Sequence, residues 1–303
     1  MNGFMERGFW IFMSAFRIIV WGILGALLFF VFSTWQEILW GNRFSMAFLD
    51  VGQGDAILIK SPQGHQILID GGPDTSIFSK LSSQIPFWNK TIDLVIATHS
   101  DKDHAEGIIE LFPRYQINNI LWSDSKENSG FAVMLRHAIE KEQEQGTAIF
   151  IAKDSQTIRW SSDPDAYGEI IWPSKEAKNT YGSSNELSLV LKFTYGEVST
   201  LFTADIPQLV EYELVEKKSE VISASILKVG HHGAKTSNTE AFIAKVSPKV
   251  AIIQVGKENR YGHPHQEVLD RFAAWGVSVL RTDVNGDIVV TSTKTSFAVE
   301  TQY

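Results

Sequence analysis

The sequence predicts a layered α/β sandwich preceded by one transmembrane helix, and three observations carry this prediction. First, an uncharged apolar run extends from residue 18 to residue 36. Second, short apolar runs typical of strands follow from residue 44 onward, with helical segments between them. Third, polar residues stand repeatedly where an apolar run ends. Because 44% of the 303 residues are apolar, the chain can bury a substantial core.

The N-terminal run has the length of a membrane span. At about 1.5 Å per residue it covers roughly the thickness of the hydrocarbon layer of a bilayer. We therefore expect a membrane anchor over residues 1–43, with a transmembrane helix at about 18–36, and one large globular domain over residues 44–303. A cleaved signal peptide and a buried soluble helix are the alternatives. Arg7 and Arg17 precede the run and Glu37 follows it, which favours a single-pass membrane protein with an extracytoplasmic domain.

The first half of the domain alternates strands with polar turns. Residues 44–60 give two strands around a Gly-Gln-Gly turn, and the next strand ends at Asp70 and a diglycine. A buried strand at 93–98 leads into the polar segment "THSDKDH", after which a helix begins near Asp103. A further helix closes at Gly146.

The second half mixes hairpins with strand–helix units. A hairpin around Tyr195-Gly196 ends at Asp205, and the apolar strand "ASILKV" ends at two histidines. Two helix-then-strand segments and a final hairpin at 286–301 follow. Apolar strands that need cover on both faces, with helices available to cover them, favour a sandwich of sheets and helices.

The segment "THSDKDH" is a candidate metal site. His99 and Asp101 can face the same side of an extended segment, whereas Asp103 and His104 at a helix start supply two diverging ligands. Four ionisable groups this close together need a counter-cation if they are buried, and the spacing suits two metals better than one. The alternative is a solvated acidic helix cap with two surface histidines. Because the chain has no cysteine, His, Asp, Glu or Asn must hold any metal.

The net charge of −8 restricts the nucleic-acid hypotheses. A protein that holds DNA by neutralising phosphates needs an excess of basic residues. Binding of DNA by this chain would require a local basic groove or bound divalent metal ions.

A series of motifs in fixed order resembles the metallo-β-lactamase superfamily and, within it, the soluble domain of the ComEC competence-protein family. The motifs are "FLDVGQGDAILI", "ILIDGG", "THSDKDH", "NELSLVL", "LFTADI", "ILKVGHHGAKTSN", "NRYGHPH" and "TDVNGDIVV". The resemblance implies a four-layer αββα sandwich with a dinuclear metal cleft between the sheets.

The resemblance also implies roles for the metal ligands. His99 and Asp101 would hold the first metal, Asp103 and His104 the second, and Asp205 would bridge them. One histidine of the pair His231 and His232 would close the second site, with His231 favoured because it is nearer the strand end.

Other residues receive supporting roles. Asp70 would orient ligands, and Asp55 would lie near the mouth of the cleft, although a tight hairpin explains its surroundings equally well. Asn185 stands where the superfamily usually has a histidine, so it would bind metal weakly, contact substrate or cap a turn. Asn259 and His263, together with Asp103, are the candidate catalytic residues, and a surface loop is the alternative for the first two.

These features lead to one functional expectation with two alternatives. An oxygen-rich first site shifts the preference from Zn²⁺ toward Mn²⁺ or Mg²⁺, but geometry can override this, and we expect Mn²⁺ or Zn²⁺, with Mg²⁺ as the alternative. We expect a membrane-anchored, dinuclear phosphodiesterase or nuclease acting on DNA during DNA uptake. Because the chain has room for one span, a separate multi-span channel protein would be its partner. The alternatives are a hydrolase of a small ester, phosphodiester or lactam, and a non-catalytic DNA-binding or scaffold subunit.

Overall fold

The computed structural model describes residues 16–32, 34, 43–124 and 127–303. The described residues fall into two compact units, one N-terminal to Arg43 and one that runs from Arg43 to Tyr303. Each unit is described by itself.

The N-terminal unit contains a helix over residues 16–32, and residue 34 is also helical. Its large apolar side chains are exposed, among them Trp21, Phe29 and Phe32. Across the described residues, no helix combines the length and the apolar character needed to cross a bilayer. The predicted transmembrane helix over 18–36 is therefore not supported. Residues 33, 35 and 36 of that prediction lie outside the described residues.

Two sheets form the centre of the second unit. The strands of the first sheet lie in the order β17 (Phe297–Thr301), β16 (Ile288–Ser292), β1 (Phe44–Phe48), β2 (Ile57–Lys60), β3 (Gln66–Ile69), β5 (Leu94–Ala97), β7 (Asn119–Trp122) and β8 (Ala148–Ile151). The strands of the second lie in the order β15 (Ser278–Arg281), β14 (Val250–Ile253), β13 (Ile226–Lys228), β12 (Val198–Phe202), β11 (Val190–Tyr195), β10 (Ala166–Trp172) and β9 (Thr157–Ile158). A separate short pair joins β4 (Thr91–Ile92) to β6 (Gln116–Ile117).

The pairing mixes antiparallel and parallel strands. The antiparallel neighbours include β16, β1, β2 and β3 in the first sheet and β10, β11 and β12 in the second. In each sheet the series that continues from there, from β3 to β8 and from β12 to β15, is parallel. Parallel strands end at the same edge of a sheet, so the loops that follow β3 and β5 lie at one edge of the first sheet, and those that follow β12 and β13 lie at one edge of the second.

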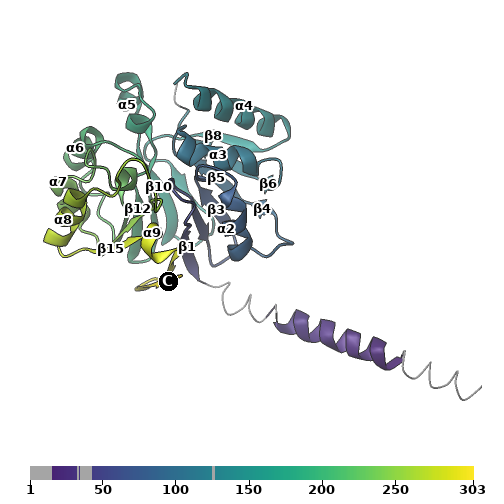
Figure 1. The fold of residues 1–303 in the computed structure, drawn as a ribbon. Helices are drawn as coiled ribbons and strands as arrows, with labels where there is room; N and C mark the ends of the chain where they lie inside the picture. Colours follow the sequence, from purple (N-terminus) through teal and green to yellow (C-terminus); the bar gives the residue numbers. More distant parts are fainter. Residues whose placement is uncertain (1–15, 33, 35–42, 125–126) are drawn as a thin grey trace, which may run out of the picture. The chain divides into compact units, whose positions relative to one another are not determined.

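Helices cover the outer face of each sheet, as Figure 1 shows. The helices on the first sheet are α2 (Ser76–Gln84), α3 (Lys102–Leu111) and α4 (Gly130–Glu144). Those on the second are α6 (Gln208–Lys217), α7 (Glu240–Val246) and α8 (Gln266–Ala274). Shorter helices, α5 (Lys175–Thr180), α9 (Thr282–Asn285), η1 (Asn185–Leu187) and η2 (Gly230–Gly233), lie in the connections.

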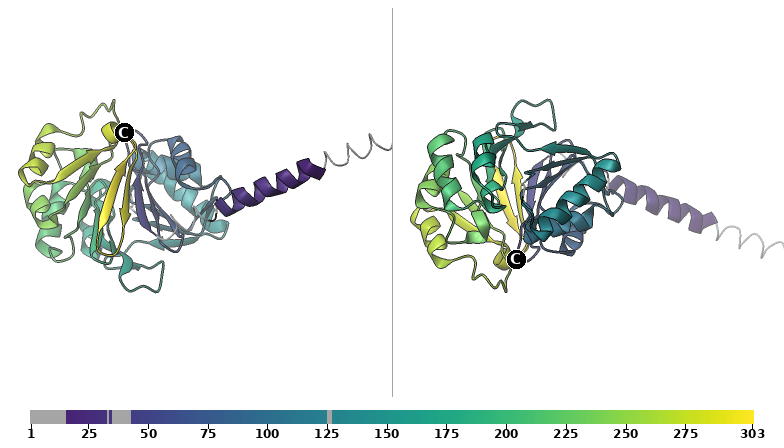
Figure 2. Two further views of the ribbon diagram at one scale, coloured as in Figure 1. Left: turned by 90° about the horizontal axis from the view of Figure 1, so that it is seen from below. Right: turned by 90° about the horizontal axis from the view of Figure 1, so that it is seen from above.

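Three apolar cores correspond to the interfaces between these layers. The central core joins the two sheets through side chains such as Phe48 and Phe202, whose rings stack. The outer cores join each sheet to its helices, for example through Ile108 of α3 and Phe272 of α8. The views in Figure 2 show the same succession of helices, sheet, sheet and helices. The predicted α/β sandwich is confirmed.

A close contact between two glycines fixes α3 against the end of β3. A Cβ atom on Gly107 would lie 1.9 Å from the carbonyl oxygen of Gly71, so no larger residue fits there. The backbone N–H of Gly71 donates to the carbonyl of His104 (2.8 Å), and that of Gly107 donates to Gly72 (3.0 Å). These contacts hold the first turn of α3 directly over the residues that follow β3.

Candidate metal centre

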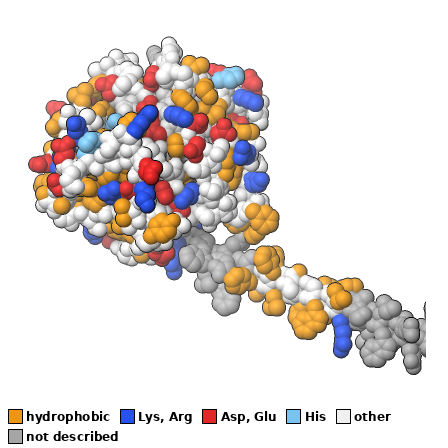
Figure 3. Space-filling view, in the orientation of Figure 1, with side chains coloured by type: hydrophobic (Ala, Val, Ile, Leu, Met, Phe, Trp, Pro, Cys, Tyr) orange, Lys and Arg blue, Asp and Glu red, His pale blue; other side chains and the backbone are white. Residues whose placement is uncertain are grey.

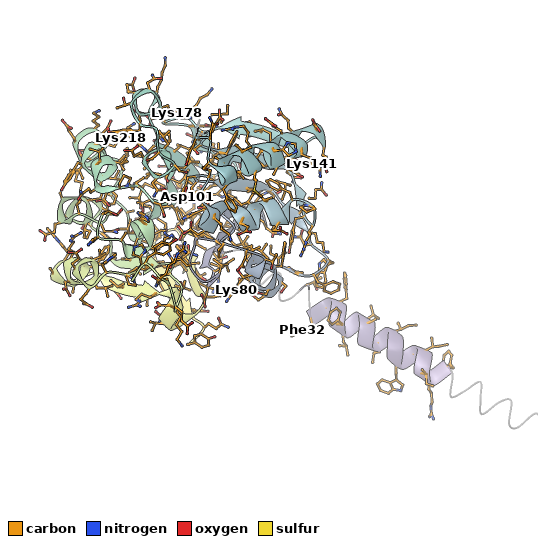
Figure 4. All side chains as sticks on the ribbon, turned by 45° about the horizontal axis from the view of Figure 1, so that its top comes forward. Phe32, Lys80, Asp101, Lys141, Lys178 and Lys218 are labelled. Carbon is orange, nitrogen blue, oxygen red and sulfur yellow. The ribbon has the colours of Figure 1, made fainter. Side chains whose placement is uncertain are left out.

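The ends of parallel strands bring the sequence motifs together. Asp70 follows β3, His99 follows β5, Asp205 follows β12, and the His231–His232 pair follows β13. The view of Figure 4 labels Asp101 between Lys80 and Lys178, over the boundary between the two helix-covered halves. The predicted residues therefore converge from both sheets on one edge of the sandwich.

His104 is oriented by Asp70. Its Nδ1 lies 2.8 Å from Oδ2 of Asp70, and the same carboxylate accepts hydrogen bonds from the backbone N–H and hydroxyl of Thr98 at 2.9 and 2.7 Å. All three residues are buried. Because Nδ1 is engaged, Nε2 of His104 faces the opposite way, toward Oδ1 of Asp205 at 3.4 Å. Asp70 thus holds the imidazole with Nε2 directed at Asp205.

His232, rather than His231, lies against the second predicted ligand set. Its Nδ1 is 2.8 Å from the carbonyl oxygen of Gln254, and its Nε2 is 3.3 Å from Asp103 and 3.5 Å from Asp205. Nε2 of His231 is 3.7 Å from Asp205, and this side chain is partly exposed. Nε2 of His232 is thus the closer of the two to these carboxylates, whereas the sequence favoured His231 as the ligand because it is nearer the strand end.

Several buried ligand atoms in this cluster have no hydrogen-bond partner. They are Nε2 of His99, His104 and His232 and Oδ1 of Asp205. A buried polar atom without a partner costs on the order of 1–3 kcal/mol. Groups of side chains here are close enough to share a metal ion, namely Asp103–His104–His232, Asp55–His104–Asp205 and Asp70–His99–His104. Imidazole nitrogens and carboxylate oxygens are ordinary metal ligands, so the residues present fit a metal centre.

The first predicted site is richer in oxygen. Nε2 of His99 is 3.8 Å from Oδ2 of Asp101, which occupies the N-cap position of α3. The buried Oδ1 of Asn185 has no hydrogen-bond partner. The neighbouring Ser184 accepts a hydrogen bond from the backbone of Ser100 (3.1 Å), which ties η1 to the loop between His99 and Asp101.

The carboxylates determine the charge of the histidines in the metal-free protein. Burial lowers the pKa of His232, but Asp205 and Asp55 raise it to about 10. Burial likewise opposes protonation of His104, yet Asp205 raises its pKa well above the usual value. Burial and the charge of His104 together lower the pKa of His99 to about 4. In the absence of metal, protons on His104 and His232 compensate the buried carboxylates, and a metal ion would replace them.

The candidate catalytic residues in the loop after β14 have different surroundings. The side-chain amide of Asn259 donates to the carbonyls of Gly256 (2.9 Å) and His263 (2.7 Å), and its oxygen accepts from the N–H of His263 (2.9 Å). The structure thus uses Asn259 to hold this loop. The ring of His263 lies 5.8 Å from that of His231, and its buried Nδ1 has no hydrogen-bond partner.

Sequence reasoning missed Lys228 and Thr98. Lys228 is buried, and its Nζ lies 2.6 Å from Oδ2 of Asp55. A lysine inside the apolar run "ASILKV" was the available signal, because a charged side chain in a buried strand needs a partner. Thr98, which fixes Asp70, carried no signal beyond its position before His99.

Comparisons with known proteins agree with this geometry. Residues 49–257 match the family described as "Metallo-beta-lactamase superfamily". ComE operon protein 3 of Bacillus subtilis is 33% identical over 79% of this chain and 32% of its own length. Competence protein ComA of Neisseria gonorrhoeae is 29% identical over 81% of this chain and 32% of its own length. The chain thus spans about a third of these curated relatives.

A solved structure supports the fold. The metallo-beta-lactamase fold protein YhfI from Bacillus subtilis superposes with a TM-score of 0.52 over 82% of this chain and 100% of YhfI. The sequences are 12% identical, so the likeness concerns the fold alone.

Proposed function

This chain belongs to the metallo-beta-lactamase superfamily and is homologous to ComEC-like competence proteins, and on that premise we propose that it is a metal-dependent phosphodiesterase that cleaves DNA during DNA uptake. The observation that carries the proposal is the convergence of unpartnered buried imidazole nitrogens and a carboxylate oxygen at one edge of the sandwich. Members of the superfamily are generally metal-dependent hydrolases, and the nuclease activity is our own extension.

We assign the ligands of two divalent ions from the contacts described above. Asp103, His104 and His232 would hold the second ion, and Asp205 would bridge to the first. His99 and Asp101 would hold the first ion with help from Asn185. The oxygen ligands of this first site favour Mn²⁺ or Mg²⁺, whereas the imidazole ligands also suit Zn²⁺, so Mn²⁺ and Zn²⁺ are the ions we propose, with Mg²⁺ as the alternative. When bound, such ions supply an activated water and stabilise negative charge on the reacting oxygens.

The protein itself would hold the ligands and the substrate. Asp70 keeps Nε2 of His104 directed inward, and Asn259 fixes the loop that carries His263. In the metal-free protein, burial, followed by the charges of His232 and His231, lowers the pKa of His263 to about 4, so its imidazole is neutral near pH 7 and can take part in hydrogen bonds to a substrate.

Exposed cations beside the ligand-bearing loops support an anionic substrate. Lys102 lies between two candidate ligands, Lys235 follows the His231–His232 turn, and Lys257 and Arg260 belong to the loop of His263. Figure 3 shows basic and acidic side chains mixed over the face that it displays. Because overall charge disfavours DNA, these cations and the metal ions would provide the local attraction for phosphates.

Cleavage of DNA by the full chain tests the proposal. We would strip the metal, add Mn²⁺, Zn²⁺ or Mg²⁺, and follow labelled single- and double-stranded DNA. We expect metal-dependent cleavage that Asp103→Ala abolishes. The matched control is Asp154→Ala, because Asp154 pairs with Lys218 in another part of the domain. A folded, metal-binding chain that leaves all DNA intact would refute the nuclease, and small esters, phosphodiesters and lactams would be tested next.

We also propose that the chain associates with a membrane, with the hydrolase domain extracytoplasmic and a separate channel protein as partner. The exposed apolar side chains of the helix over 16–32 support this association. Flotation with lipid vesicles tests it: the full chain should float, and Leu27→Glu/Leu28→Glu should not. Equal flotation of both would contradict a role for this helix.

A further inference from the structure

Lys228 is a buried lysine at the end of β13, close to the candidate ligands. Only 1% of its surface is exposed. Its ammonium donates to the carbonyl oxygen of Val229 at 2.9 Å and lies 2.6 Å from Oδ2 of Asp55. Burial of an ammonium group is unfavourable unless the group is paired. An apolar side chain would fill this position in the core without that cost, so packing alone does not explain the lysine.

Asp55 connects Lys228 to two histidines of the metal centre. Its Oδ1 is 3.3 Å from Nδ1 of His232, and its Oδ2 is 3.9 Å from Nδ1 of His104. Its backbone N–H donates to the carbonyl of Asp103 at 3.2 Å. Burial raises the pKa of Asp55, but Lys228 and His232 together bring it below the usual value, so the carboxylate is ionised. Among the contacts of the described residues, Asp55 is therefore the only side chain between Lys228 and the histidines proposed to hold the second ion.

The charges of the cluster balance only when Lys228 is counted. The carboxylates of the cluster are Asp55, Asp70, Asp101, Asp103 and Asp205, which sum to −5 when ionised. Two divalent ions contribute +4 and Lys228 contributes +1, so the total is zero. Without Lys228, a fully loaded centre would keep one negative charge in a largely buried environment.

We propose that Lys228 is a built-in cation of the metal centre, a positioning residue that neutralises Asp55 and thereby limits how tightly the ions are held. The inference rests on the proposed metal centre. With Lys228 present, Asp55 supports His232 and His104 without adding net negative charge around the ions. Bound ions then remain electron-poor, which favours their action on an anionic substrate.

The proposal predicts an unusual result, because removal of a cation should tighten metal binding. Lys228→Met keeps a long apolar side chain and leaves Asp55 uncompensated. Even at an effective dielectric constant of about 20, a unit charge anywhere within roughly 15 Å of a divalent ion changes its affinity by more than about tenfold. We expect at least about tenfold tighter Mn²⁺ binding at pH 8 and a lower melting temperature for the metal-free variant.

A charge-balanced set of variants makes the test specific. Asp55→Asn leaves Lys228 uncompensated and should weaken Mn²⁺ binding by about tenfold or more. The double variant Asp55→Asn/Lys228→Met restores the wild-type charge and should bind Mn²⁺ within about threefold of wild type, since the added and lost charges cancel. Lys192→Met is the control, because Lys192 of β11 donates to the carbonyl oxygen of Val221, away from the cluster.

The experiment is a Mn²⁺ titration of each full-length variant against a competing chelator. If Lys228→Met does not fold, the comparison of Asp55→Asn with the double variant measures the same effect of Lys228. The proposal is overturned if Lys228→Met binds Mn²⁺ within twofold of wild type and the double variant binds it within twofold of Asp55→Asn. Lys228 would then have a structural role only. Failure of the wild type to bind Mn²⁺, Zn²⁺ or Mg²⁺ would instead refute the metal centre itself.

Discussion

Replacing Asp70 by asparagine should misorient one metal ligand without changing the shape of the site. In the native protein, Oδ1 of Asp70 accepts from the backbone of Thr98, and Oδ2 accepts from the Thr98 hydroxyl and the Nδ1–H of His104. An asparagine that keeps the bond to the Thr98 backbone presents an NH₂ group to His104. Two donors then face each other, so the imidazole must move its proton to Nε2, where it blocks metal binding.

The size of the effect follows from this single hydrogen bond. A hydrogen bond to a charged group contributes about 1.5–3 kcal/mol, which corresponds to a change in affinity of roughly 10- to 150-fold. Residues that orient metal ligands typically change metal affinity by about 10- to 100-fold when mutated. We therefore expect Asp70→Asn to weaken metal binding about 10- to 100-fold. The Thr98 hydroxyl can reverse and accept from the new amide, so folding should change little.

Competition with a chromophoric chelator measures the affinity, and circular dichroism measures the melting temperature. Asp93→Asn is the matched control, because Asp93 also accepts a backbone hydrogen bond, from Gln66 at the start of β3 (2.8 Å). Wild-type affinity in Asp70→Asn would show that Asp70 does not set the tautomer of His104. Equal loss of affinity in Asp93→Asn would show a general effect on folding.

Three further predictions concern pH, the first site and the glycine contact. Because the pKa of His232 rises from 6.5 to about 10 on folding without metal, its contribution to stability is complete below pH 6.5 and is lost as the pH rises toward 10. Metal binding expels this proton and the proton on His104, so chelator titrations at pH 7 and 9 should show affinity rising about tenfold per pH unit for each proton expelled, or up to about 100-fold per unit. Asn185→His adds an imidazole beside the first site and should tighten Zn²⁺ binding at least about tenfold, while unchanged metal content by elemental analysis would contradict a ligand position. Gly107→Ala brings a Cβ to 1.9 Å from the Gly71 carbonyl oxygen and should cost about 3 kcal/mol in urea unfolding, whereas Gly130→Ala, with open space around it, should be nearly neutral.

The local pattern of apolar and polar residues was sufficient to predict the α/β sandwich. It also identified which polar residues follow the strand ends. Strand-like runs that end in His99, Asp205 and the two histidines after β13 are visible in the sequence, because alternation and strand ends are local properties. Helix α2 and strand β10 were not predicted, since neither has a strong local signal. The order of the strands in the sheets could not be predicted from local patterns either, because strands far apart in the chain pair with each other. For example, β1 pairs with β16 across more than two hundred residues.

The sequence by itself determined which chemical groups are available, and the tertiary structure decided which of them face the centre. His231 and His232 are adjacent, and both have positive φ angles of 52°. Asn238 holds this turn by accepting from the N–H of Gly230 (3.0 Å) and donating to its carbonyl (2.9 Å). That contact, together with the Gln254 carbonyl on Nδ1, turns His232 inward. The pairing of Lys228 with Asp55 likewise joins segments far apart in the chain. Sequence patterns encode local periodicity, whereas the direction of a side chain in a loop depends on hydrogen bonds from distant segments.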